Sequence, residues 1–180
     1  MTRVVAGEWG GRRLQTRKGD GTRPTSDRVR EAMFSTVESE MGGWEDDSRV
    51  FDLYAGSGAL GIEAMSRGAS TAVFVESDRR AADVIKRNLA ALGTPNGAVI
   101  RTSVQRFLET PDHFDVAFVD PPYDLPHDRL SRVLTQLAEW REPNAIIVVE
   151  RSTRTPFAWP EGLTGFRDKA YGETHLWYGR

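Results

Sequence analysis

The sequence predicts an α/β fold of the Rossmann-like kind, with a parallel sheet closed by a C-terminal antiparallel hairpin and preceded by a small N-terminal β-hairpin extension. Three observations predict it. From Arg49 onward, short apolar runs alternate with stretches of helical spacing, which is typical of βαβ units. The first of these runs ends in the glycine-rich turn 56–58, as in nucleotide-binding sheets. The last two runs flank Gly172, which favours an antiparallel pair.

The N-terminal segment is predicted to be a β-hairpin with a polar linker. The runs 3–6 and 12–14 flank a glycine-rich bend, and residues 15–22 are polar. A lone hairpin is marginal in water, so this one should pack on the body or on a partner. Residues 1–30 hold eight basic and three acidic side chains, whereas the whole chain has a net charge of −2. A basic front end on an acidic body suits an anionic partner.

The remaining elements follow in order. A helix should start at Thr25 or Ser26, which are good N-caps, and end at Gly42-Gly43. Strands are expected at 49–53, 72–75, 97–101, 114–119 and 145–149, helices at about 59–67, 79–92, 103–109 and 128–140, and the closing hairpin at 164–170 and 173–178. We therefore divide the chain into a basic N-terminal extension, made of the hairpin and linker at residues 1–22, and one α/β domain at residues 23–180.

The glycine turn predicts half of a nucleoside site. Glycines leave space for a ligand to approach the backbone at the helix start. Glu76 ends the next apolar run, where a carboxylate can accept hydrogen bonds from both ribose hydroxyls. The pattern also matches a dinucleotide fingerprint. However, Asp52 stands four residues before Gly56, and its negative charge suits a cationic ligand better than a pyrophosphate. S-adenosylmethionine, with its sulfonium, ammonium and ribose, is therefore favoured over NAD.

A second motif, Asp120-Pro121-Pro122-Tyr123, follows the fourth strand and should lie beside the glycine turn. The Asp120 carboxylate and the Pro121 carbonyl can accept the two hydrogens of an exocyclic amine, and Tyr123 offers a face on which a base can stack. Two acceptors free the nitrogen lone pair for attack on a sulfonium methyl group, mainly through orientation and electrostatics. Alone, the motif is also compatible with a simple turn.

Composition excludes several classes. The chain has no cysteine, which removes disulfides, thiolate metal sites and methylation of pyrimidine C5 through a cysteine nucleophile. Its three histidines lack metal-ligand spacing, so we expect no metal. No apolar run approaches the ~20 residues of a membrane helix, and the N-terminus lacks an apolar signal segment. We therefore expect a cytoplasmic protein without a membrane partner.

With these motifs the chain resembles class I S-adenosylmethionine-dependent methyltransferases that act on exocyclic amines of nucleic-acid bases. The segments Arg3–Gly7, Gly11–Leu14 and Arg23–Glu31 narrow the resemblance to the RsmD family. It covers essentially the whole chain and implies methylation of N2 of one guanine in bacterial 16S ribosomal RNA. The implied cofactor-binding residues are Thr25 at the methionine end, Asp52, Ala55, Gly56, Ser57, Gly58, Glu76, Ser77, Ser103, Val104 and Asp120. The implied catalytic residues are Asp120, Pro121, Pro122 and Tyr123.

The resemblance also makes the basic hairpin the RNA-binding feature, with expected contacts at Arg3, Trp9, Arg12, Arg13, Arg23 and Arg28. Trp9 could equally anchor the hairpin to the body. The expected partner is 16S rRNA in a partly or fully assembled small subunit, and the expected state is a monomer. Two alternatives stay open. One is an amino methyltransferase acting on adenine N6 or cytosine N4, and the other is an RNA-binding module without catalysis.

Overall fold

The computed structural model describes residues 2–17 and 25–180. Its strands are β1 (Thr2–Arg3), β2 (Arg13–Leu14), β3 (Arg49–Leu53), β4 (Thr71–Val75), β5 (Gly97–Ile100), β6 (Phe114–Val119), β7 (Arg141–Ser152), β8 (Gly165–Tyr171) and β9 (Thr174–Gly179). Its helices are α1 (Asp27–Met41), α2 (Ala59–Arg67), α3 (Arg79–Leu92), α4 (Val104–Phe107) and α5 (His127–Trp140). The predicted order of elements from residue 25 onward is confirmed.

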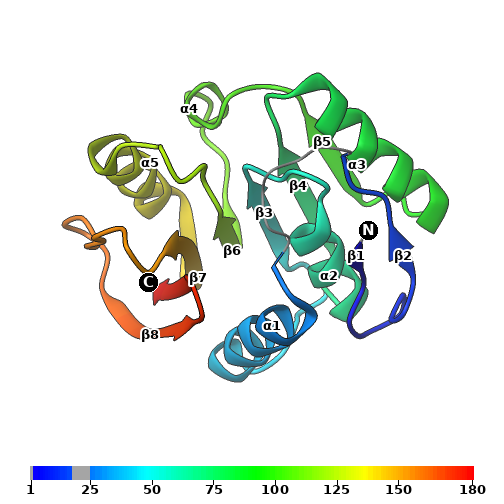
Figure 1. Cartoon of the computed structure of the whole chain (residues 1–180), viewed down its shortest axis with the longest axis horizontal. Helices are drawn as coiled ribbons and strands as arrows, with labels where there is room; N and C mark the ends of the chain where they lie inside the picture. Colours follow the sequence, from blue (N-terminus) through cyan, green and yellow to red (C-terminus); the bar gives the residue numbers. More distant parts are fainter. Residues whose placement is uncertain (1, 18–24) are drawn as a thin grey trace.

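Seven strands form one sheet in the order β5-β4-β3-β6-β7-β9-β8 (Figure 1). The first five of these run parallel, and the hairpin of β8 and β9 closes the sheet in antiparallel fashion against β7. The strand β3 pairs with β4 on one side and β6 on the other, so the winding direction reverses there. Ligands of open α/β sheets bind at the carboxyl ends of the strands at such a reversal.

Alternation along the strands builds two cores, one on each face of the sheet. In β3, Val50 joins a cluster with residues of α1, α2 and α3, whereas its neighbour Phe51 joins a cluster with residues of α4 and α5. Strand side chains point alternately to opposite faces, so strands buried on both faces are apolar throughout. This explains why the strands appear in the sequence as continuous apolar runs.

Local signals fix the ends of the helices. The Ser26 hydroxyl accepts a hydrogen bond from the Val29 N–H and caps α1, which selects the second of the two predicted N-caps. In the same way Asp78 caps α3 and Ser103 caps α4. The helix α4 is only four residues long, and it is shorter than predicted.

The strand β7 departs most from expectation, because it extends beyond 145–149 at both ends. Its first part contains Pro143, which cannot donate to a ladder, and Asn144, whose φ is 68°. The pairing of β6 with β7 shifts register between Phe114 and Val116, which absorbs this irregular stretch. Because Pro143 and Asn144 are typical of turns, the sequence did not predict that β7 begins before them.

The N-terminal hairpin lies against α2 and α3, as Figure 1 shows. The Val5 and Ala6 N–H groups donate to Glu63 at 2.8 and 3.1 Å, and the Glu8 N–H donates to the carbonyl of Ser66. Val4 and Leu14 are buried in the core. The hairpin is therefore docked on the body. The predicted boundary near residue 22 lies outside the described residues. Among the described residues, no helix is both long and apolar enough to cross a membrane.

Candidate active site

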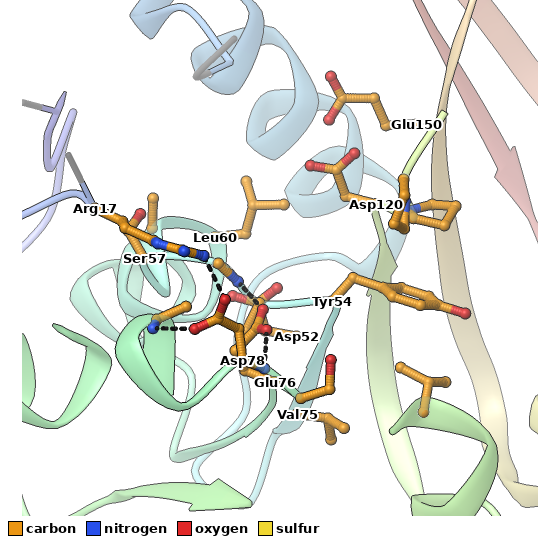
Figure 2. Close-up of a pocket in the computed structure, with 18 of the residues that line it drawn as sticks. Arg17, Asp52, Tyr54, Ser57, Leu60, Val75, Glu76, Asp78, Asp120 and Glu150 are labelled. Carbon is orange, nitrogen blue, oxygen red and sulfur yellow. Dashed lines mark hydrogen bonds and ion pairs between the residues drawn. The ribbon is translucent and has the colours of Figure 1, made fainter. Parts of the chain in front are cut away.

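A cavity of about 550 Å³ opens at the carboxyl edge of the sheet, between β3, β4 and β6 (Figure 2). It brings together thirteen residues that the sequence singled out, from segments distant along the chain. They are Thr25, Asp52, Ala55, Gly56, Ser57, Glu76, Ser77, Ser103, Val104, Asp120, Pro121, Pro122 and Tyr123. The two predicted half-sites, the glycine turn and the proline loop, thus share one space. The individual roles of these residues remain predictions.

The glycines of the turn serve different purposes. Gly56 has a φ of 60° and open space where a side chain would begin, so the backbone is bare towards the cavity. Gly58 has a φ of 82° and faces the side chains of Phe74 and Ile85. It forms the N-cap of α2 and lies behind the turn, outside the residues that line the cavity, and its contact with a cofactor stays a prediction.

Glu76 lies beside the glycine turn and ties it to the loop after β4. One carboxylate oxygen accepts the Gly56 N–H at 2.9 Å, and the other accepts the Asp78 N–H at 2.8 Å. Each carboxylate oxygen can accept more than one hydrogen bond, so Glu76 keeps capacity for ligand hydroxyls. Asp78 in turn forms an ion pair with Arg17, which brings the end of the hairpin segment to the cavity. The N-terminal extension therefore contributes to the lining.

Asp52 is buried, with 1% of its surface exposed, and accepts the Gly61 N–H at 2.9 Å. Burial, with a smaller contribution from the negative charge of Glu76, raises the pKa of Asp52 to about 8 against the opposing effect of the hydrogen bond from Gly61. A buried carboxyl of this kind ionises when a cation binds beside it. The position therefore favours a cationic ligand, as the sequence indicated.

A second acidic group, Glu150 at the end of β7, faces Asp120 across the cavity wall (Figure 2). The Thr25 hydroxyl donates to both Glu150 carboxylate oxygens, at 3.2 and 3.4 Å. The desolvation of both carboxyls raises the pKa of each, and the charge of Glu150 raises that of Asp120 further. Sequence reasoning missed Glu150. The signal was present, because Glu150 directly follows the fifth predicted strand, as Asp120 follows the fourth.

Arg151 holds the proline loop. Its guanidinium is buried and donates to the carbonyls of Pro122 and Leu125, both at 3.1 Å. The carbonyl of Pro121, which the sequence assigned to the amine, is not used by Arg151. Tyr123 stands at the cavity with 54% of its surface exposed, so one side of its ring is accessible to a base.

Tyr54 was also missed. It lines the cavity with a φ of 60°, a left-handed conformation that is uncommon for a bulky residue and costs about 1–3 kcal/mol. Such strain gathers at ligand sites, so a positive φ directly before a glycine turn is a functional signal. Nothing in the residue type itself reveals it.

The predicted RNA-binding residues that the structure describes lie outside the cavity. Arg3, Arg12, Arg13 and Arg28 are exposed, and Arg23 lies outside the described residues. Arg3 pairs with Asp27 at 2.7 Å, and Arg12 donates to the carbonyl of Ala91 at the end of α3. Trp9 is half-buried against the core, so its ring anchors the hairpin. The exposed basic side chains of the hairpin are therefore carried by a segment that is packed against the body of the protein.

A seven-stranded sheet of this order, with a glycine turn after β3 and an acceptor loop after β6, defines a class I methyltransferase fold. The family described as Conserved hypothetical protein 95 matches residues 2–180. The chain belongs to it, and the predicted membership in the RsmD family is confirmed.

Two relatives and one solved structure match most of this chain. Ribosomal RNA small subunit methyltransferase D of Haemophilus influenzae is 38% identical over 94% of this chain and 89% of its own. The Escherichia coli K12 protein of the same name is 37% identical over 82% of this chain and 73% of its own. Among solved structures, Escherichia coli yhhF gives a TM-score of 0.83 at 32% identity, covering 99% of this chain and 96% of its own.

Proposed function

We propose that this protein transfers a methyl group from S-adenosylmethionine to the exocyclic N2 of one guanine in bacterial 16S ribosomal RNA. One observation supports the proposal: Glu76, the proposed ribose acceptor, and Asp120, the proposed amine acceptor, line the same cavity. The names of the relatives support a ribosomal RNA substrate from the small subunit. The guanine itself comes from the resemblance to the RsmD family.

The lining fits the proposed cofactor. Five acidic side chains face the cavity, namely Asp52, Glu76, Asp78, Asp120 and Glu150. These carboxyl groups would repel a pyrophosphate, and in their ionised form they would attract a sulfonium and an ammonium group, which disfavours NAD. Glu76 would accept the ribose hydroxyls, and Ser103 and Val104 would flank the adenine. Thr25 would lie at the methionine end. When bound, S-adenosylmethionine supplies a methyl group activated by the positive sulfur.

The proline loop would orient the target amine. The Asp120 carboxylate and the Pro121 carbonyl would accept its two hydrogens, while Tyr123 stacks on the base. Arg151 keeps the loop rigid through two carbonyls, so the acceptors are in place before the substrate arrives. Preorganised acceptors lower the barrier because no reorganisation is needed during the reaction.

The exposed arginines of the hairpin and of α1 would meet phosphates around the flipped-out guanine, and phosphate contacts set affinity and register. The partner would be 16S rRNA within the assembling or assembled small subunit, in the cytoplasm, with the protein acting as a monomer. The hairpin also covers part of the core, so substitutions of single arginines test this surface more cleanly than a deletion.

The experiment uses small subunits from a strain that lacks the gene. Incubation with the protein and S-adenosylmethionine should restore one N2-methylguanine, located by mass spectrometry of nuclease fragments. The Asp120→Ala variant should keep most of its affinity for S-adenosylmethionine in calorimetry and lose about 10²–10³ in rate. Methylation of adenine N6 or cytosine N4 would overturn the guanine assignment. Failure of the wild-type protein to bind S-adenosylmethionine would leave an RNA-binding module instead.

A further inference from the structure

A groove of about 300 Å³ lies between the end of the N-terminal hairpin segment and the helix α3. Residues 15–17 line one wall, and side chains of α3 line the other. Asn88 of α3, which is only 3% exposed, ties the walls together, because its amide accepts the Gln15 N–H at 2.8 Å and donates to the Gln15 carbonyl at 3.1 Å. Figure 1 shows β2 beside α3. The groove is therefore a fixed feature of the fold.

The α3 wall of the groove is basic. Arg80, Asp83 and Arg87 line it at the spacing of one helix face, and all three are exposed. Within residues 2–17 and 25–180, neither arginine forms an ion pair. Arg79 and Lys86 are exposed as well. The helix thus carries four basic side chains and one acidic one, on a chain whose net charge is −2.

The groove adjoins the proposed cofactor cavity, because Thr16 and Arg17 line both. Arg17 forms an ion pair with Asp78, which caps α3 and also lines the cavity. Arg80 and Arg87 line the groove and not the cavity. An anion bound by these two arginines would therefore lie next to the cofactor and outside its cavity.

The arrangement of charges suits a polyanionic strand. Arg80 and Arg87 are seven residues apart, which separates their backbones by about 10 Å along the helix, so each can meet its own phosphate. A guanidinium group matches phosphate oxygens with paired N–H donors. Arg12 donates to the carbonyl of Ala91 near the end of α3, so the basic surface continues from the groove to the hairpin. A nucleic-acid backbone carries a charge at every nucleotide, whereas an acidic protein segment would need carboxylates at matching intervals.

We propose, on the basis of the function given above, that this groove binds the phosphate backbone of the substrate RNA, with Arg80 and Arg87 on two different phosphates. Figure 2 shows Arg17 and Asp78 at one side of the cavity and Asp120 at the other. The contacted phosphates therefore belong to nucleotides that flank the target guanine. Such contacts fix the register of the RNA independently of its sequence. The helix α3 adds a surface to the hairpin and α1, from which the sequence predicted RNA contacts.

The first test measures RNA affinity without any reaction. Filter binding at several salt concentrations uses a protein-free 16S rRNA fragment that carries the methylated position. Arg80→Gln and Arg87→Gln should each lower the steepness of log Kd against log salt by about 0.7–0.9, and the double variant by about twice as much. The Kd of the double variant at about 0.1 M salt should rise roughly ten-fold or more. Both sites are exposed, and glutamine is a good helix former, so the fold is kept.

The matched control is Arg106→Gln/Arg132→Gln, which removes the same charge from exposed sites on α4 and α5. It should leave the Kd and the salt dependence unchanged. An equal loss in this control would mean that only net charge matters, and would overturn the proposal. A double α3 variant with the salt dependence of a single one would refute the two separate phosphates. Affinity for S-adenosylmethionine should stay within about two-fold, and a larger loss would place these arginines in the cofactor site instead.

The second test uses the absence of cysteine from the chain. Asp83→Cys introduces a unique thiol between Arg80 and Arg87, to which an iron chelate that cleaves nearby RNA can be attached. In complexes with small subunits, cleavage should fall at nucleotides near the target guanine. Glu139→Cys on α5 is the control and should not give these cuts. Cleavage by the Asp83→Cys protein that does not exceed this control would refute the proposal.

The two proposals fail in different ways. If the wild-type protein methylates no subunit, the proposed function fails, while the salt dependence still measures whether α3 contacts RNA. If Arg80→Gln/Arg87→Gln weakens binding to small subunits but not to protein-free RNA, the groove meets an acidic face of a ribosomal protein, and the RNA contact is wrong. If methylation by the wild type succeeds and the α3 variants bind RNA as tightly as it does, only the groove proposal fails.

Discussion

The substitution Glu76→Gln tests both roles of Glu76, its support of the glycine turn and its proposed binding of the ribose. It replaces one carboxylate oxygen with an amide NH₂ group. The carboxylate accepts two backbone N–H groups, from Gly56 and Asp78. Glutamine has one acceptor oxygen and an NH₂ group, so one of these N–H groups would face another donor. A hydrogen bond to a charged group contributes about 1.5–3 kcal/mol. We therefore expect the free energy of unfolding to fall by about that amount, and the thermal midpoint to fall by roughly 3–12 °C for a chain of this size.

Affinity for S-adenosylmethionine should fall as well, because the ribose hydroxyls lose a charged acceptor. The loss of about 1.5–3 kcal/mol corresponds to roughly 10–100-fold in Kd. Calorimetric titration at a temperature where the variant is fully folded measures it. The exposed Glu109→Gln is the control and should alter neither quantity. Binding of S-adenosylmethionine by Glu76→Gln within two-fold of wild type would refute the ribose assignment.

Three further predictions concern other parts of the site. The pKa of Asp52 is about 8 in the folded protein and near 3.8 when unfolded, so its contribution to stability decreases as pH rises between these values. Binding of a cation there should release protons at pH 7, seen as a dependence of the calorimetric heat on the buffer. The double variant Arg12→Glu/Arg13→Glu should weaken binding to small-subunit RNA and flatten its salt dependence, unlike Arg132→Glu on α5. The Arg151→Met variant should reduce turnover and leave cofactor affinity intact, and equal turnover would show that the loop does not need this clamp.

Much of the fold was predictable because the βα units are local. Each strand appears as an apolar run, and three of the helices, α1, α3 and α4, begin at a residue whose side chain caps them, such as Ser26 or Asp78. The start of β7 was hidden because Pro143 and Asn144 resemble a turn, and only pairing with β6 makes this stretch extended. Local rules cannot foresee a conformation that a neighbouring strand imposes.

The site was predictable where its residues sit in motifs and hidden where they meet through sheet order. The glycine turn and the proline loop are both short contiguous motifs, so both can be recognised in the sequence. Glu150 does not, because its importance depends on β7 lying beside β6 in register. Likewise, the contact of Val5 and Ala6 with Glu63 joins residues nearly sixty positions apart, and no periodicity in the hairpin indicates it.

The short helix α2 connects the N-terminal hairpin with the cavity. Its first turn donates the Gly61 N–H to Asp52 in the cavity, and its last turns hold the hairpin through Glu63 and Ser66. A nine-residue helix is a stiff rod. If RNA binds the hairpin as proposed, a displacement of the hairpin would reach the cavity floor through α2, and filling the cavity would constrain the hairpin. By thermodynamic reciprocity, each ligand would then alter the affinity of the other by the same factor.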